Sequence, residues 1–196
     1  LQVHTLDSGT VVLGDLGGGS LEVSILQEGK LQRQESLNFG TLRWQRAAQV
    51  PELEASFHES VQILQSDAIA TAQRLVLSGG NAKWLGRILA EETQHEFVPI
   101  SGLEIPWAEV QPRLQKIAAA GPETWRTRWR MRPQQIETFG AALRMFRLLG
   151  ETVEPEHLRL SGLALKEALL LQSAETLGIR NPAIRIAPSY DQPKTS

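Results

Sequence analysis

The hydrophobic pattern changes its period after the first forty residues, and this change constrains the fold more than any other feature. Apolar and polar residues alternate over 21–26 and 31–39, after a short apolar run at 11–13, and this is typical of half-buried strands. Over residues 53–72 the apolar positions recur every three to five residues, which indicates a helix. Three strands in a meander, followed by helices and strands in alternation, predict an α/β domain with a mixed sheet.

The rest of the chain continues this alternation. We expect a mixed five-stranded sheet whose first three strands are antiparallel, with helices on both faces. Gly121 and Gly150 are expected to end two of the helices, because glycine is favoured just past a helix end. The later elements are expected as strands at 74–77, near 96–98 and at 158–160, and as helices at 81–92, within 101–121, at 133–149 and at 163–178.

Composition excludes several classes of protein. The chain has 196 residues, of which 41% are hydrophobic, so one large domain with a real core is expected. The net charge of -2 excludes a global basic field, and we expect no nucleic-acid partner. The absence of cysteine excludes disulfides and thiolate metal sites and fits a cytoplasmic location. No apolar run of about 18 residues could span a membrane, and the four scattered histidines do not suggest a metal site.

Three consecutive glycines lie between Asp15 and Glu22 in the stretch "GDLGGGSLEV". The familiar phosphate loops join a strand to a helix and have G-x-G-x-x-G or Gly-Lys-Ser/Thr spacing, which this stretch lacks. A run of glycines lets the backbone approach a ligand closely and present several N–H groups to one anion. A hairpin here would place both carboxylates at one end of the sheet, where they suit Mg²⁺ beside a phosphate. The spacing alone leaves a purely structural turn as an equal alternative.

Five segments of the chain, in order, resemble the motifs of the exopolyphosphatase / guanosine pentaphosphate phosphohydrolase (Ppx/GppA) family. The segment "GDLGGGSLEV" resembles the signature D-I/L-G-G-G-S-x-E, and "SLNFGTLRW" resembles S-L-x-x-G-x-x-R. The segments "LVLSGGNAKWLGRI", "RMRPQQIETFGAAL" and "LSGLALKEALLLQ" are similar to G-T/S-G-G-T, M-R-P-E-R-A-D and S-x-x-G-L-R-E-G-L-L-L. The resemblance runs from about residue 3 to about residue 173. It implies a ribonuclease-H-like fold of the actin–hexokinase superfamily.

The same resemblance implies a domain organisation. Residues 1–185 would be the second, C-terminal, of two actin-like domains, and residues 186–196 a polar tail. The chain begins at Leu1 without a signal-peptide pattern, and we interpret it as the interior of a longer protein. The family's first domain, which supplies the catalytic glutamate, is absent, so we expect this fragment alone to be nearly inactive. The expected protein partners are that first domain and a second copy in a homodimer, with no membrane.

The implied chemistry is the release of terminal phosphate from inorganic polyphosphate or guanosine pentaphosphate. Water attacks the terminal phosphate in line, and Mg²⁺ neutralises charge. Asp15 and Glu22 would position the metal ion or its waters. The terminal phosphoryl group would be held by Gly17, Gly18, Gly19 and Ser20, and further substrate contacts are expected from Ser78, Gly79, Gly80, Arg43 and Lys166.

The chain also departs from the family pattern, and these departures keep other functions open. They leave the choice between polyphosphate and guanosine pentaphosphate undecided. They also motivate a second hypothesis, a non-catalytic module that binds phosphate or a nucleotide or serves in regulation. A third, a sugar or acetate kinase relative, lacks a visible sugar-binding segment. The departing positions are Asn81, Gln135, Glu137, Ala164 and Ala168, together with Lys166, where a lysine replaces arginine and loses its planar fork.

Two other features admit a functional and a structural interpretation. The arginines and tryptophans of "TWRTRWRMR", residues 124–132, could form a track for a polyanion. We favour a solvated surface loop whose tryptophans anchor it to the core. The turn at 78–80 could contact phosphate at a helix N-terminus or could be an ordinary turn. Arg43 and Trp44 are also expected to pack and cap the end of the third strand.

Overall fold

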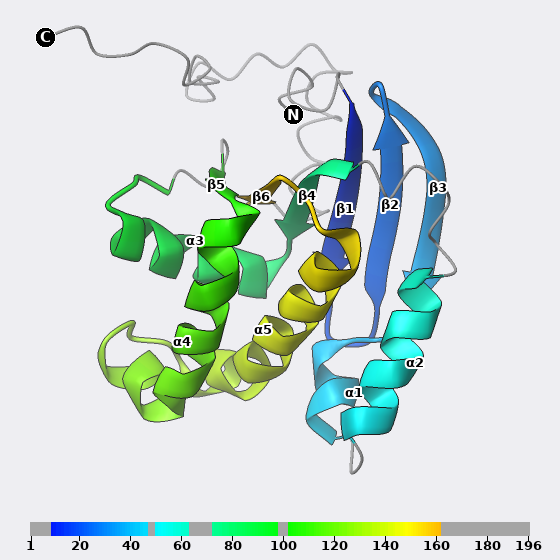
Figure 1. The fold of residues 1–196 in the computed structure, drawn as a ribbon. Helices are drawn as coiled ribbons and strands as arrows, with labels where there is room; N and C mark the ends of the chain where they lie inside the picture. Colours follow the sequence, from blue (N-terminus) through cyan, green and yellow to red (C-terminus); the bar gives the residue numbers. More distant parts are fainter. Residues whose placement is uncertain (1–8, 47–49, 63–71, 98–101, 162–196) are drawn as a thin grey trace, which may run out of the picture.

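The structure, a computed structural model, describes residues 9–46, 50–62, 72–97 and 102–161 (Figure 1). A β-meander opens the fold, and helices and shorter strands then alternate. In chain order the elements are β1 (Thr10–Leu16), β2 (Leu21–Gln27), β3 (Lys30–Leu37), α1 (Thr41–Arg46), α2 (Val50–Gln62), β4 (Ala72–Ser78), α3 (Gly80–Thr93), β5 (Leu103–Pro106), α4 (Trp107–Thr127), α5 (Pro133–Val153) and β6 (His157–Leu160).

The strands form one mixed sheet in the order β3-β2-β1-β4-β6-β5. The first three strands pair antiparallel, β4 runs parallel to β1 and to β6, and β5 pairs antiparallel with β6. The mixed sheet and the antiparallel meander are therefore confirmed. The expected number of five strands is wrong, because the described residues contain six.

The additional strand, β5, has only four residues and ends in a proline, so its sequence pattern is weak. Proline is tolerated there because β5 is an edge strand. The strand expected near 96–98 is wrong at Glu96 and Phe97, which lie in no strand, and residue 98 lies outside the described residues. The ring of Phe97 packs instead against Gly86 of α3, and this core contact explains the apolar position.

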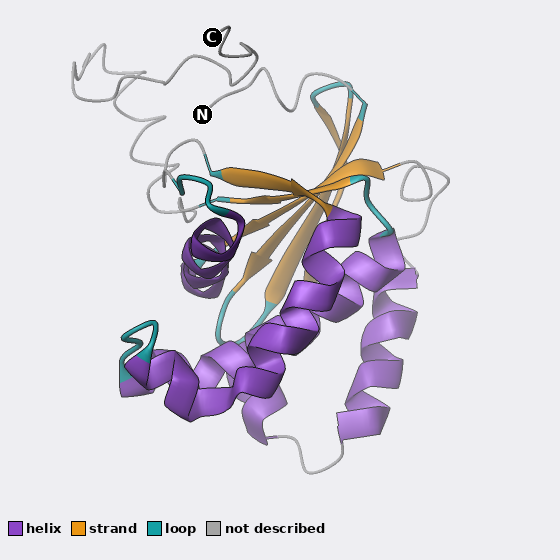
Figure 2. Cartoon of the chain, turned by 60° about the vertical axis from the view of Figure 1, so that its left-hand side comes forward, coloured by secondary structure: helices purple, strands orange, loops and turns teal. Residues whose placement is uncertain are grey.

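The described helices all lie on one side of the sheet (Figure 2). Alternate strand residues on this side, among them Val23 and Leu77, are buried in a single apolar cluster with the helices. Their neighbours on the opposite side, such as Ser24 and Val76, are only partly buried. Of the helices that we expected on both faces of the sheet, those on this face are confirmed. The helix expected at 163–178 lies outside the described residues.

The helix expected over 53–72 is confirmed as α2 up to Gln62. Residues 63–71 lie outside the described part, and Ala72 is wrong as a helical residue because β4 begins there. The six-residue helix α1 was not expected. Helix α1 is held by the buried side chain of Trp44. The ring of Trp44 packs edge to face on the ring of Phe57, with 5.7 Å between the ring centroids. Aromatic packing thus stabilises a helix too short to form by itself.

Gly150 does not end α5, contrary to expectation, because the helix runs on to Val153. A Cβ added at Gly150 would overlap the indole ring of Trp107, at the start of α4. Glycine therefore allows α4 and α5 to pack closely at this point. The helix ends instead at Glu154, which has a left-handed φ of 47°.

Gly121 does interrupt the preceding helix, as expected, with a φ of 73°. A second helical stretch then continues to Thr127, which the sequence pattern did not predict. In this stretch Trp125 is buried, donates its indole N–H to the carbonyl of Ile117 at 2.9 Å, and packs on Phe139.

The tryptophans of the segment 124–132 point into the core, since Trp129 is buried as well. The exposed Arg126 and Arg128 pair with Glu123 and Glu91, at 2.6 Å and 3.0 Å. The interpretation that the tryptophans anchor this segment to the core is therefore confirmed, whereas a loop is wrong for its first residues, which are helical up to Thr127. Buried rings cannot serve as a stacking platform for a polyanion.

Candidate functional site

The three glycines form a tight hairpin between β1 and β2, as expected. Leu16 pairs with Leu21, and the N–H of Gly17 donates to the carbonyl of Ser20 at 3.0 Å. None of the three glycines in this loop has a positive φ. The glycines with a positive φ lie elsewhere in the described chain. The loop therefore does not need glycine for a left-handed backbone, which was the reason for glycine in a purely structural turn.

Steric crowding within the chain does not explain all three glycines either. A Cβ added at Gly19 would meet no described atom within 4 Å, and one at Gly17 would make only an ordinary contact at 3.5 Å. A Cβ at Gly18 would come within 3.1 Å of the flexible side chain of Leu42. Gly19 thus faces open space, where a side chain would obstruct only something that binds from outside.

The start of α1 holds the loop from behind. The N–H groups of Thr41 and Leu42 donate to the carbonyls of Gly17 and Gly18, at 3.1 Å and 2.9 Å. The Nε of Arg43 donates to the carbonyl of Gly19 at 3.2 Å. Because these carbonyls are bound on the α1 side, the loop has a fixed conformation.

The N–H groups of Gly18, Gly19 and Ser20 donate to no acceptor within the part of the chain that the structure describes. These three successive N–H groups are therefore available to an anion that approaches the loop. Arg43, an expected substrate contact, lies at this loop, and its Nε supports the loop backbone.

Gly40 makes the close packing of α1 on the loop possible. A Cβ at this position would overlap backbone atoms of Gly18 and Gly19, which cannot move aside as a side chain could. Gly40 was not predicted as a site residue. Its signal was its place in the segment "SLNFGTLRW".

The two predicted metal ligands lie opposite each other across the β1–β2 pair. Asp15 and Glu22 are register partners, so both side chains lie on the same face at the loop end of the hairpin. Burial raises the pKa of Asp15 above its ordinary value of 3.8, a hydrogen bond from Ser78 lowers it, and the negative charge of Glu22 raises it. A cation shared by the two carboxylates would offset the negative charge of Glu22 that acts on Asp15.

Glu22 is held by two serine hydroxyls. Ser20 Oγ donates to Glu22 Oε1 at 2.5 Å, and Ser36 Oγ donates to the same oxygen at 3.1 Å. No group of three or more histidine, cysteine, aspartate or glutamate side chains forms a metal site in the described ranges. Two carboxylates fit Mg²⁺, which usually takes one or two protein carboxylates and completes its shell with waters and phosphate oxygens.

The turn at 78–80 lies beside Asp15. Ser78 is the register partner of Asp15 in the parallel β1–β4 pair, so the ends of both strands meet at one edge of the sheet. Gly79 has a φ of 98°, and a Cβ there would lie 2.9 Å from the carbonyl oxygen of Leu16 and 3.1 Å from Asp15 Oδ1. Helix α3 begins at Gly80 without a side-chain cap, and such a helix start favours a nearby anion.

Two of the described positions that depart from the family pattern, Asn81 and Gln135, have hydrogen-bond partners. Asn81, in the first turn of α3, accepts a hydrogen bond from Thr138 of α5 at 3.4 Å. Gln135 accepts one from the N–H of Arg132 at 2.8 Å and so caps the start of α5. Lys166, Ala164 and Ala168 lie outside the described residues.

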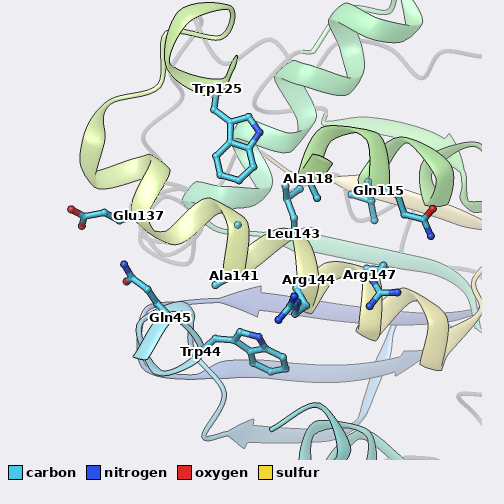
Figure 3. A pocket seen from close by; sticks show the side chains of 12 residues that line it. Trp44, Gln45, Gln115, Ala118, Trp125, Glu137, Ala141, Leu143, Arg144 and Arg147 are labelled. Atoms are coloured by element: carbon cyan, nitrogen blue, oxygen red, sulfur yellow. The ribbon is translucent and has the colours of Figure 1, made fainter. Parts of the chain in front are cut away.

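A cavity of about 680 Å³ lies elsewhere, between α1, α4 and α5 (Figure 3). Its two arginines, Arg144 and Arg147, pair with Glu54 and Glu151, at 3.5 Å and 3.3 Å. Their charge is therefore balanced, and no residue of the glycine loop lines this cavity. We place the candidate site at the loop rather than in the cavity, because the carboxylates and the free N–H groups are at the loop.

The strand order, the hairpin and its carboxylates together define a ribonuclease-H-like, actin-like α/β domain. The family model of the Ppx/GppA phosphatase family matches residues 2–177. The chain therefore belongs to the Ppx/GppA phosphatase family. Comparison with curated proteins found no match.

Solved structures support the fold. A crystal structure of the Ppx/GppA family member of Aquifex aeolicus has a TM-score of 0.69 at 18% identity and aligns with 87% of this chain and 57% of its own. An exopolyphosphatase from Cytophaga hutchinsonii has a TM-score of 0.66 at 14% identity, with 89% of this chain and 59% of its own aligned. The chain thus spans less than two thirds of these proteins. None of the described helices is long and apolar enough to cross a membrane.

Proposed function

We propose that this chain forms one side of the active site of a phosphohydrolase that releases terminal phosphate from inorganic polyphosphate or guanosine pentaphosphate. The observation that carries the proposal is the loop itself. Gly19 faces open space, has no left-handed φ, and is flanked by N–H groups without a described acceptor. A loop of this kind suits a bound phosphate better than a structural turn.

In this proposal the N–H groups of Gly18, Gly19 and Ser20 bind the oxygens of the terminal phosphoryl group. Asp15 and Glu22 would hold Mg²⁺ directly or through its waters, and the ion would supply charge neutralisation at the phosphoryl group. Ser78 holds the Asp15 carboxylate in place, and the start of α3 adds a favourable field. Catalysis on this side is therefore positioning and charge neutralisation.

The group that activates the attacking water is proposed to come from a first domain of the same protein. Support for this comes from the coverage of the relatives, of which this chain aligns with 57% and 59%. The site lies at the carboxyl ends of β1 and β4, and in this proposal the first domain closes over it. The isolated chain is expected to be nearly inactive.

The test is phosphate release from polyphosphate and from guanosine pentaphosphate, with and without Mg²⁺. The full-length protein should release phosphate, and Asp15→Asn and Glu22→Gln should each lower the rate by about 100-fold or more. Ser24→Ala is a matched control, since Ser24 lies on the same face of β2 as Glu22. Substrate binding without release by the full-length protein would favour the non-catalytic module, and full activity of the isolated chain would refute the two-domain proposal.

A further inference from the structure

The side chains of Ser20 and Ser36 converge on one atom. Both hydroxyls donate to Glu22 Oε1, at 2.5 Å and 3.1 Å. They come from different parts of the meander. Ser20 is in the glycine loop, and Ser36 is the register partner of Glu22 across the β2–β3 pair. The same carboxylate oxygen is therefore bound from the loop and from the edge strand.

This geometry has a chemical consequence for Glu22. A hydroxyl has one hydrogen to donate, so each serine uses its hydrogen on Glu22. With Oε1 accepting two bonds, the carboxylate plane is fixed and Oε2 is the oxygen left for an outside ligand. The Ser20 hydroxyl is then a support for Glu22, and the loop offers its backbone N–H groups to a phosphate.

We propose that Ser36, together with Ser20, is a positioning residue that orients the Glu22 carboxylate for a divalent cation. This inference rests on the proposed function. Ser36 is not one of the residues that the glycine loop would have suggested, because it lies 14 residues after Glu22 and on another strand. Groups that orient a metal-binding carboxylate typically change metal affinity by 10- to 100-fold when removed, roughly. For Ser36 we expect a change in metal affinity of about 10-fold, because its side chain is exposed.

The test uses the full-length protein and Mn²⁺ as the probe, with free Mn²⁺ followed by electron paramagnetic resonance. The readout is a dissociation constant and does not depend on turnover. Ser36→Ala should weaken Mn²⁺ binding about 10-fold, and Ser36→Thr, which keeps the hydroxyl, should restore it. Ser24→Ala removes a hydroxyl on the same face of β2 and should leave the constant unchanged.

A coupling experiment separates positioning from a general effect on folding. If Ser36 acts through Glu22, then Ser36→Ala should add no further loss of Mn²⁺ affinity in the Glu22→Gln background. An additive loss would overturn the proposal. So would an unchanged Mn²⁺ constant in Ser36→Ala, or a Ser36→Thr variant as weak as Ser36→Ala while both melt at the temperature of the wild type.

Failure of the proposed function gives a different result. If the wild-type protein binds no Mn²⁺ at millimolar concentration, the cation site itself is wrong and the positioning role is wrong with it. If Mn²⁺ binding is measurably weaker in Glu22→Gln but unchanged in Ser36→Ala, the site stands and only the role of Ser36 is refuted.

Discussion

The glycines of the helical layer and those of the loop between β1 and β2 are needed for different physical reasons. In the helical layer, a Cβ at Gly150 would overlap the ring of Trp107, and a Cβ at Gly86 would overlap the ring of Phe97. In the loop, a Cβ at Gly19 would meet no described atom within 4 Å. The helical glycines are required by the packing of the chain, whereas the loop glycine is required by nothing in the described chain. The comparison teaches that a glycine without an internal reason indicates a ligand.

Gly40 combines both roles, and its substitution should have the largest effect on stability and activity together. It is required by packing, but what it packs against is the loop. Gly40→Ala should displace the loop from α1 and destabilise the protein by about 3 kcal/mol, as overpacking does. Phosphate release should fall more than stability alone explains, because the free N–H groups move. Thermal unfolding and kcat/KM of the same preparation check this, and a loss of stability with full activity in the folded fraction would contradict it.

Gly19→Ala should break function and leave folding unchanged. The added methyl group meets open space in the described chain, so the melting temperature should stay within about 1 °C. A phosphate pushed away by that methyl group should lose about 100-fold in kcat/KM, as misplacement of roughly 1 Å does. Steady-state kinetics on polyphosphate measure the effect. Activity equal to the wild type would show that the loop is a structural turn.

Gly150→Ala should give the opposite pattern. The methyl group overlaps the Trp107 ring, and relief by a shift of α5 should cost about 2 kcal/mol in the free energy of unfolding. This corresponds to roughly 4 to 8 °C in melting temperature for a protein of this size. Specific activity well below the melting transition should be unchanged. Calorimetry and an assay at low temperature separate the two quantities, and a selective loss of activity would link α5 to the site.

Asp15→Asn should change the stability only slightly, and the sign of the change is informative. Because burial raises the pKa of Asp15 above 3.8, the folded state favours the protonated form. That contribution is complete below the ordinary pKa and is lost as the pH rises through the raised pKa, so the charged carboxylate destabilises the fold at neutral pH. The asparagine should therefore raise the melting temperature at pH 7 by about 1 °C, since the Asp15 side chain is only partly buried.

Added Mg²⁺ should make the wild type more stable than the Asp15→Asn variant at pH 7. A cation that binds only the folded state stabilises the wild type in proportion to its saturation, and the variant should not respond. Melting curves at pH 4 and pH 7, with and without 10 mM MgCl₂ (on the order of a saturating concentration), give the comparison. A variant less stable than the wild type at neutral pH without Mg²⁺ would contradict the assigned effect of burial.

The hairpin and its carboxylates could be predicted because the information is local. Asp15 and Glu22 flank a short glycine turn, and antiparallel pairing through such a turn leaves little freedom of register. Ser78, Ser36 and Gly40 lie in segments that resemble family motifs, so a role for them could be suspected. Their contacts with the loop and its carboxylates could not be predicted from the sequence. Ser78 reaches Asp15 across 63 residues of chain, and only the parallel β1–β4 register brings the two together.

The failed expectations follow the same division. Gly121 interrupts its helix as a glycine can by local conformation, whereas Gly150 has the same identity and a different role because Trp107 packs on it. The strand β5 and the helix α1 are short, and each is held by neighbours distant in sequence. Local preference cannot detect an element whose stability comes from packing.

By itself the sequence determined the strand meander, the helix and strand alternation and the glycine hairpin between two carboxylates, because period, turn composition and short-range pairing are encoded in neighbouring residues. Only the tertiary structure decided that α1 supports the loop, that Ser36 and Ser20 share one oxygen of Glu22, and that Ser78 meets Asp15. These contacts depend on strand register and helix packing, which are set when the whole apolar face is buried at once.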